Sequence, residues 1–144
     1  MANVKKVNEY LSNLAVLNVK LHNIHWNVEG NQFQRIHNFT EEIYDDLFAK
    51  YDEIAEMLKM KEEKPLVTMK DYLENASVEE SSKDVFSVKE SLETVKEDLE
   101  LMKKLATEIR NEADEENDFE AVAIFEDHVA DYSLNIWFVR AMLG

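Results

Sequence analysis

Residues 22–58 read HNIHWNVEGNQFQRIHNFTEEIYDDLFAKYDEIAEML, and this stretch decides the predicted fold. After a turn expected at Gly30, a continuous helical pattern runs on to about Glu62. At about 100° per residue, this helix presents two stripes that both favour burial. The first is purely apolar: Ile36, Phe39, Ile43, Leu47, Ile54 and Leu58. The second mixes aromatic residues with potential metal ligands: His37, Glu41, Tyr44, Phe48, Asp52 and Ala55, with Glu56 at its edge.

The spacing of the ligand types on the second stripe predicts a site shared between two chains. His37 and Glu41 are one helical turn apart, as are Asp52 and Glu56, so either pair can hold an ion. The pair centres, near positions 39 and 54, lie about 15 residues and roughly 22 Å apart along the axis. Because metal–ligand bonds are only about 2–2.5 Å long, the pairs cannot share an ion within one chain. A two-fold partner whose copy of the helix runs antiparallel would join them, giving two equal sites per dimer.

Composition predicts a single helical domain covering residues 1–144. Two glycines and one proline leave few places to turn, and the absence of cysteine excludes disulfides and zinc–thiolate sites. No apolar run approaches the roughly 20 residues of a membrane span. The N-terminal residues lack the apolar core of a signal peptide, so we expect a cytoplasmic protein.

The charge balance opposes binding to phosphates. Sixteen basic and 31 acidic residues give a net charge of −15, which disfavours nucleic acid and anionic membranes. The acids have two interpretations that the charge count leaves open: a solvated surface, or a cavity or pore used by cations. Four acids on the helix after Gly30 are candidates for such a cavity wall: Glu42, Asp45, Asp46 and Glu53.

The order of elements predicts an all-α four-helix bundle with one crossover. Apolar periodicity and capping signals place long helices over residues 3–28, 31–62 and 87–113 and from residue 117 onward, and a short helix over 68–76. The expected helix-capping residues are Gly30 at a C-terminus and, at N-termini, Asn31 with Gln34, Ser87 with Glu90, and Asn117 with Glu120. Residues 77–87 are the expected polar linker.

Two imidazoles and three carboxylates make a plausible ligand set for Fe(II), Mn(II) or Zn(II). These ligands are His25, His37, Glu41, Asp52 and Glu56. Taken alone, His25 is better explained as a core histidine bonded to a backbone carbonyl, but His37 and the carboxylates downstream reverse this and favour the metal interpretation. No histidine follows a glutamate at the Glu-x-x-His spacing, which excludes the usual intrachain di-iron site of a bundle. A hydrolase is not favoured, because no nucleophile–base pair or phosphate-binding glycine loop is present.

At these residues the sequence resembles the Dps mini-ferritins. The similar motifs are His25-Trp26-Asn27-Val28-x-Gly30-x-x-Phe33-x-x-x-His37, Asp52-x-x-x-Glu56, the short segment Leu73–Ser77 and the C-terminal Ile136–Gly144. The resemblance extends over nearly the whole chain and implies a ferritin-like bundle. It also implies a hollow dodecamer that acts as a ferroxidase, oxidising Fe(II) with hydrogen peroxide or oxygen at a di-iron centre and storing the ferric product.

The resemblance also assigns residues to roles. It places His25, His37 and position 41 in one subunit, with Asp52 and Glu56 from its two-fold neighbour, in agreement with the antiparallel pairing. Position 41 is commonly Asp in the family and is Glu here. Asp118 matches an acid lining the family's three-fold pore, whereas the second pore acid falls on Ala123, with Glu120, Glu126 and Asp127 as possible substitutes. Trp26, beside the site, is a candidate trap for stray oxidising equivalents.

Two other functions remain as alternatives. Some Dps proteins are structural DNA-compacting proteins, usually with a lysine-rich tail. Here the N-terminal segment carries only Lys5 and Lys6, at the start of the first expected helix, so we expect no useful DNA binding. A bundle that has lost its metal site is the other alternative, and the intact ligand set argues against it.

Overall fold

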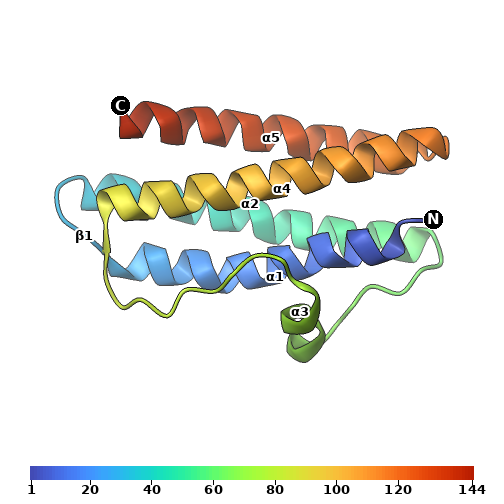
Figure 1. Cartoon of the computed structure of the whole chain (residues 1–144), viewed down its shortest axis with the longest axis horizontal. Helices are drawn as coiled ribbons and strands as arrows, with labels where there is room; N and C mark the ends of the chain where they lie inside the picture. The colour runs from blue at the N-terminus through green and yellow to red at the C-terminus, as the bar shows by residue number, and fades with distance from the viewer.

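The computed structural model describes residues 1–144 and confirms the all-α fold. Its helices are α1 (Val4–Asn27), α2 (Phe33–Met60), α3 (Met69–Asn75), α4 (Val88–Glu115) and α5 (Phe119–Leu143). The long helices pack as two hairpins, α1 with α2 and α4 with α5, and the short α3 packs against α1 (Figure 1). No helix combines the length and apolar character needed to cross a membrane.

Helix α2 places its two stripes as predicted. The apolar stripe is buried in the core of the bundle, at Ile36, Phe39, Ile43, Leu47, Ile54 and Leu58. The second stripe is left at the surface of the single chain, where the side chain of Phe48 is 57% exposed. A large apolar side chain beside polar ligand types therefore lies uncovered on one face of α2.

The long crossover from α3 to α4 is tied to the end of α1 by a contact that the sequence did not predict. Strand β1 (Val28–Glu29) pairs in parallel with strand β2 (Phe86–Ser87), so the end of the expected polar linker is extended and partly buried. Gly30 then takes a positive φ of 112°. The turn lies where we expected it. However, α1 ends at Asn27, three residues before Gly30, so Gly30 follows strand β1 and does not cap the helix.

Of the three predicted N-caps, Ser87 is confirmed, whereas Asn31 and Asn117 are wrong. The hydroxyls of Thr68 and Ser87 accept hydrogen bonds from backbone N–H groups at the starts of α3 and α4. Asn117 has a φ of 58°, the left-handed conformation that closes α4, so Asp118 becomes the N-cap of α5. Asn31 does not cap α2: Gln32 occupies the N-cap position, also with positive φ, and without a side-chain bond.

Candidate metal centre

His25 and His37 are fixed by a reciprocal pair of hydrogen bonds across the turn at Gly30. His25 Nδ1 lies 2.7 Å from the backbone oxygen of His37, and His37 Nδ1 lies 2.8 Å from the backbone oxygen of His25. Because a carbonyl oxygen only accepts, each Nδ1 is the donor. In its neutral form, each ring with Nδ1 as donor keeps a lone pair on Nε2, the atom that can bind a metal ion.

The two imidazole rings are also held by packing. They stack with centroids 3.7 Å apart and an interplanar angle of 14°. The buried Thr40 hydroxyl lies 3.2 Å from His25 Nδ1 and 2.9 Å from the backbone oxygen of Ile36. Sequence reasoning missed Thr40, although a hydroxyl one turn after a candidate ligand is a recognisable signal. His25 is buried and bonded to a carbonyl, as the core-histidine interpretation had it, yet its other nitrogen remains free.

Glu41 is the third candidate ligand on this side of the chain, and with His25 and His37 it is here called the histidine half-site. Its Oε1 lies 4.0 Å from His25 Nε2, beyond a hydrogen bond. Two metal–ligand bonds of about 2.1 Å span up to about 4.2 Å, so an ion between the two atoms is sterically possible. Tyr44 donates a long 3.5 Å hydrogen bond to Glu41 and stacks on His22, with ring centroids 3.8 Å apart. These aromatic neighbours limit the positions open to the glutamate.

Asp52 and Glu56 lie one turn apart on the exposed face of α2, and this candidate pair is here called the carboxylate half-site. The pKa of Glu56 is raised by a hydrogen bond with Asp52 and by the charge of that carboxylate. A bound cation would relieve this repulsion. Within one chain, however, no group of three or more metal-type side chains comes close enough to hold an ion. The candidate ligands of one chain therefore lie in two separate groups.

Trp26 follows His25 directly but points away from the core, with 68% of its surface exposed. Its ring centroid lies 5.6 Å from that of His22. The residue is accessible beside the histidine half-site, and its role as a trap for oxidising equivalents stays a prediction.

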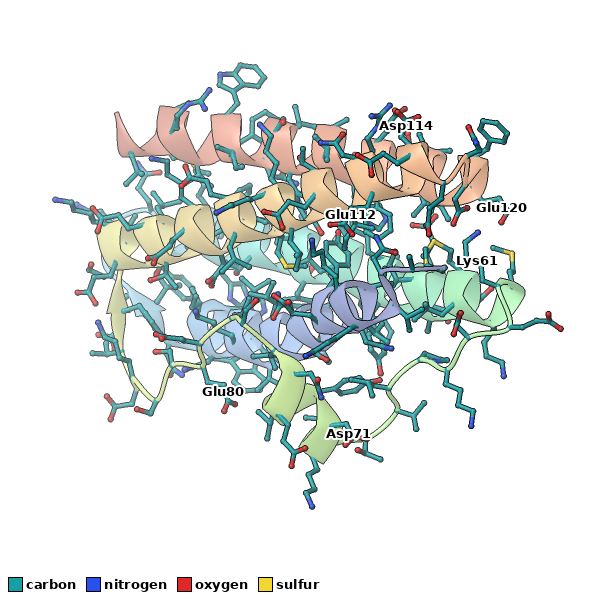
Figure 2. All side chains as sticks on the ribbon, turned by 45° about the vertical axis from the view of Figure 1, so that its right-hand side comes forward. Lys61, Asp71, Glu80, Glu112, Asp114 and Glu120 are labelled. Carbon is teal, nitrogen blue, oxygen red and sulfur yellow. The ribbon has the colours of Figure 1, made fainter.

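The predicted pore acid, Asp118, is engaged inside the chain. Its carboxylate caps α5 by accepting from the backbone of Ala121 at 3.3 Å, and it lies 2.5 Å from the ammonium of Lys61. Lys61 also reaches Glu120, and Figure 2 shows these two residues at the same end of the bundle. The other possible substitutes differ: Glu126 pairs with Arg110, whereas Asp127 is exposed and has no ion pair.

The four candidate cavity acids also divide into two kinds. Asp46 pairs with Lys50 at 2.6 Å, and Glu53 accepts from His128 at 2.6 Å. Glu42 and Asp45 make no ion pair and are exposed. Only the latter two retain a carboxylate that is free to meet a cation.

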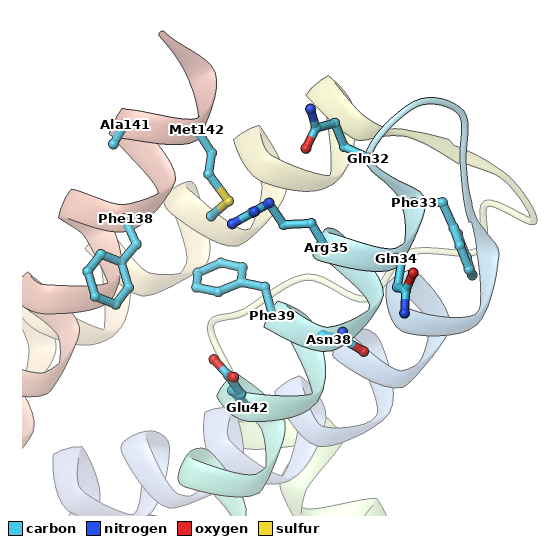
Figure 3. Close-up of a pocket in the computed structure, with 10 residues that line it drawn as sticks. All are labelled: Gln32, Phe33, Gln34, Arg35, Asn38, Phe39, Glu42, Phe138, Ala141 and Met142. Atoms are coloured by element: carbon cyan, nitrogen blue, oxygen red, sulfur yellow. The ribbon is translucent and has the colours of Figure 1, made fainter.

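A hollow of about 830 Å³ lies where the start of α2 faces the end of α5. Figure 3 shows Arg35 and Phe39 of α2 pointing toward Phe138 and Met142 of α5. The hollow contains none of the predicted ligands. Four of the candidate ligands therefore lie on the outer face of α2 and outside this hollow, whereas His25 is buried on α1.

Comparison with known proteins agrees with this fold. A family model for the ferritin-like domain matches residues 4–144. The DNA protection during starvation protein of Helicobacter pylori is 34% identical over 129 residues, covering 90% of each chain. The chain belongs to the Dps branch of the ferritin-like family. That membership confirms the predicted resemblance and the predicted ferritin-like bundle.

Solved structures support the same placement in the Dps family. The crystal structure of Helicobacter cinaedi CAIP has a TM-score of 0.95 and 35% identity, covering 98% of this chain and 99% of that one. A Dps protein from Vibrio cholerae O1 has a TM-score of 0.92 and 26% identity, with 96% and 87% covered. That protein is described as a member of a broad superfamily of ferritin-like diiron-carboxylate proteins. Dps membership supports an iron-related role in stress protection.

Proposed function

We propose that this chain oxidises Fe(II) at sites shared between two-fold related copies and stores the ferric product inside a closed shell of twelve copies. Hydrogen peroxide is the preferred oxidant and oxygen the slower one. The observation that carries the proposal is the separation of the ligands into two half-sites on α2. One offers two free imidazole nitrogens and a carboxylate, and the other offers a pair of repelling carboxylates.

The uncovered face of α2 supports the sharing of a site between copies. Phe48 lies between the half-sites, and more than half of its surface is exposed in the single chain. An exposed aromatic side chain of this size indicates a surface that another molecule covers. An antiparallel second copy would cover it and would place Asp52 and Glu56 opposite His25, His37 and Glu41. Two-fold symmetry then produces two identical sites.

The ligands of the proposed site suit the oxidation of Fe(II). Carboxylates stabilise Fe(III) more than Fe(II), so Glu41 and the partner's Asp52 and Glu56 favour loss of an electron from the bound substrate. The histidines supply neutral nitrogen donors whose Nδ1 atoms are already engaged, so they do not reorient as iron binds. Two Fe(II) ions each give one electron to one peroxide molecule, whose O–O bond breaks to leave two hydroxides. Because both electrons are delivered together, no hydroxyl radical is released.

DNA compaction is the second candidate, since relatives carry the name DNA protection during starvation protein. The net charge of −15 per chain opposes direct binding to phosphates. We infer that any protection of DNA comes from removing iron and peroxide. A gel shift at ~150 mM salt that shows micromolar or tighter binding would contradict this inference.

The test follows oxidation of Fe(II) by peroxide and by oxygen on protein whose assembly mass has been measured. We expect Asp52→Asn to slow oxidation at least about tenfold, because it removes the charge of one ligand without changing its size. Glu93→Gln, which changes an exposed acid of α4, is the matched control and should leave the rate unchanged. Equal rates for both variants, or a stable monomer under all conditions, would contradict the proposal.

A further inference from the structure

Three side chains form a hydrogen-bonded chain through the centre of the bundle, here named the Tyr10 relay. The Tyr10 hydroxyl of α1 lies 2.8 Å from Nδ1 of His128 in α5. His128 Nε2 lies 2.6 Å from Oε1 of Glu53 in α2. Tyr10 and His128 are buried, whereas 49% of the Glu53 side chain is exposed. The relay therefore runs from a sealed phenol to a solvated carboxylate, and the proposed iron site does not use it.

The hydrogen bonds fix where the protons lie. A carboxylate only accepts, so His128 Nε2 carries the ring proton and Nδ1 is the acceptor for the Tyr10 hydroxyl. Burial lowers the pKa of His128, which keeps the ring neutral at neutral pH. The Tyr132 hydroxyl, 2.5 Å from that of Tyr10, donates to the Tyr10 oxygen. Tyr10 is thus a buried phenol with a base ready to receive its proton.

We propose that Tyr10 is a reversible one-electron donor whose hydroxyl proton moves to His128 Nδ1 when the electron leaves. The physical reason is that a phenol is costly to oxidise while it keeps its proton. A base at hydrogen-bond distance removes that cost by taking the proton in the same step. Burial then keeps the resulting phenoxyl away from solvent and from other proteins.

The step balances in electrons and protons. The oxidant is a one-electron oxidant of the class formed when Fe(II) meets peroxide in free solution, such as the hydroxyl radical, which is reduced to hydroxide. At Tyr10 the O–H bond breaks and an N–H bond forms on His128, giving a neutral phenoxyl and an imidazolium paired with the Glu53 carboxylate. One electron from Fe(II), which becomes Fe(III), and return of the proton restore the phenol. This restoring step rests on the proposed function; the donation from Tyr10 does not.

Other buried tyrosines lack this arrangement. The Tyr132 hydroxyl has Tyr10 as its only partner. The Lys50 ammonium lies 5.7 Å from the Tyr132 ring centroid and disfavours the positive charge that develops when a phenol loses an electron. Tyr72 donates to the backbone oxygen of Leu66 at 2.8 Å and meets the Tyr51 hydroxyl at 2.6 Å. No imidazole is bonded to Tyr72. It is therefore a matched control: a buried tyrosine bonded to another tyrosine but to no base.

The test uses the metal-free assembled protein and a flash-generated ruthenium(III) tris-bipyridine as oxidant, so it is independent of iron chemistry. Electron paramagnetic resonance of frozen samples should show a long-lived tyrosyl radical, identified with ring-deuterated tyrosine. We expect Tyr10→Phe to abolish this signal and Tyr72→Phe to leave it unchanged. His128→Gln keeps both hydrogen bonds but supplies no base, so it should lower the yield about tenfold or more. If the relay only stabilised the fold, the radical yield would not depend on whether residue 128 is a base.

An unchanged signal in either Tyr10→Phe or His128→Gln would overturn the proposal. A second measurement needs no variant and holds even if a substitution prevents folding. In wild-type protein labelled with ¹⁵N-histidine, the radical should show coupling to a histidine nitrogen. A tyrosyl radical without that coupling, or no tyrosyl radical at all, would also overturn it. Failure of the ferroxidase assay would leave this result unaffected.

Discussion

Replacing Phe48 with alanine should break the two-fold pairing that the proposed site needs. The side chain is 57% exposed in the single chain. For a side chain of about 200 Å², covering that fraction removes roughly 115 Å² of apolar surface from water, or about 3 kcal/mol at ~25 cal/mol/Å². An isologous interface loses this contribution twice, so the dimer should weaken by about 6 kcal/mol, or about four powers of ten in Kd.

The assay combines sedimentation velocity over a range of protein concentrations with Fe(II) oxidation on the same samples. We expect Phe48→Ala to lower the assembly mass and the oxidation rate together, because the half-sites no longer meet. Phe48→Leu is the matched control. It keeps most of the apolar area and should retain both mass and rate. A Phe48→Ala protein with wild-type mass and wild-type oxidation would show that this face of α2 does not join the two copies.

Two further predictions concern charged and titratable groups. The pKa of His128 is lowered by burial and by Lys50, with Glu53 opposing, so below about pH 6.5 the unfolded chain binds a proton that the folded chain does not. Stability against denaturant should therefore fall as pH drops below about 6.5, and His128→Gln should flatten this slope; parallel curves for the two proteins would contradict the assignment. Asp118→Asn keeps the helix cap and removes one carboxylate charge, so we expect up to about tenfold slower oxidation at limiting Fe(II) if Asp118 lies on the uptake path. A lower melting temperature with an unchanged rate would instead restrict Asp118 to its pairing with Lys61.

The features that the sequence predicted are those set by local periodicity. Along α2, a repeat of 3.6 residues places Ile43 in the core and Phe48 outside whatever the rest of the chain does. The same helical geometry places His37 and Asp52 too far apart to bind one ion within a single chain. Ser87 was predicted as a cap because its partner, the backbone of Glu90, is three residues away.

What the sequence did not predict depends on residues far apart in the chain. Tyr10 and His128 are 118 positions apart, and nothing in either local pattern indicates that they meet. Glu53 was grouped with possible cavity acids because its helix position is polar; its bond to His128 appears only once α5 packs against α2. The pairing of β1 with β2 is similarly long-range. Asn117 failed as a cap because both it and Asp118 are good capping residues, and only the backbone closure of α4 distinguishes them.

Mixing two inactive variants tests the shared site most directly. In His37→Ala and Asp52→Ala, every site of each parent assembly lacks a ligand. The two proteins are unfolded, mixed and reassembled, and co-assembly is verified by differential mass labelling. In a mixed dimer one site carries both lesions, while the other combines the intact His37 half with the intact Asp52 half. With random mixing about half the dimers are mixed, so roughly a quarter of wild-type oxidation should return. Verified co-assembly with oxidation no faster than either parent would contradict a site shared between chains.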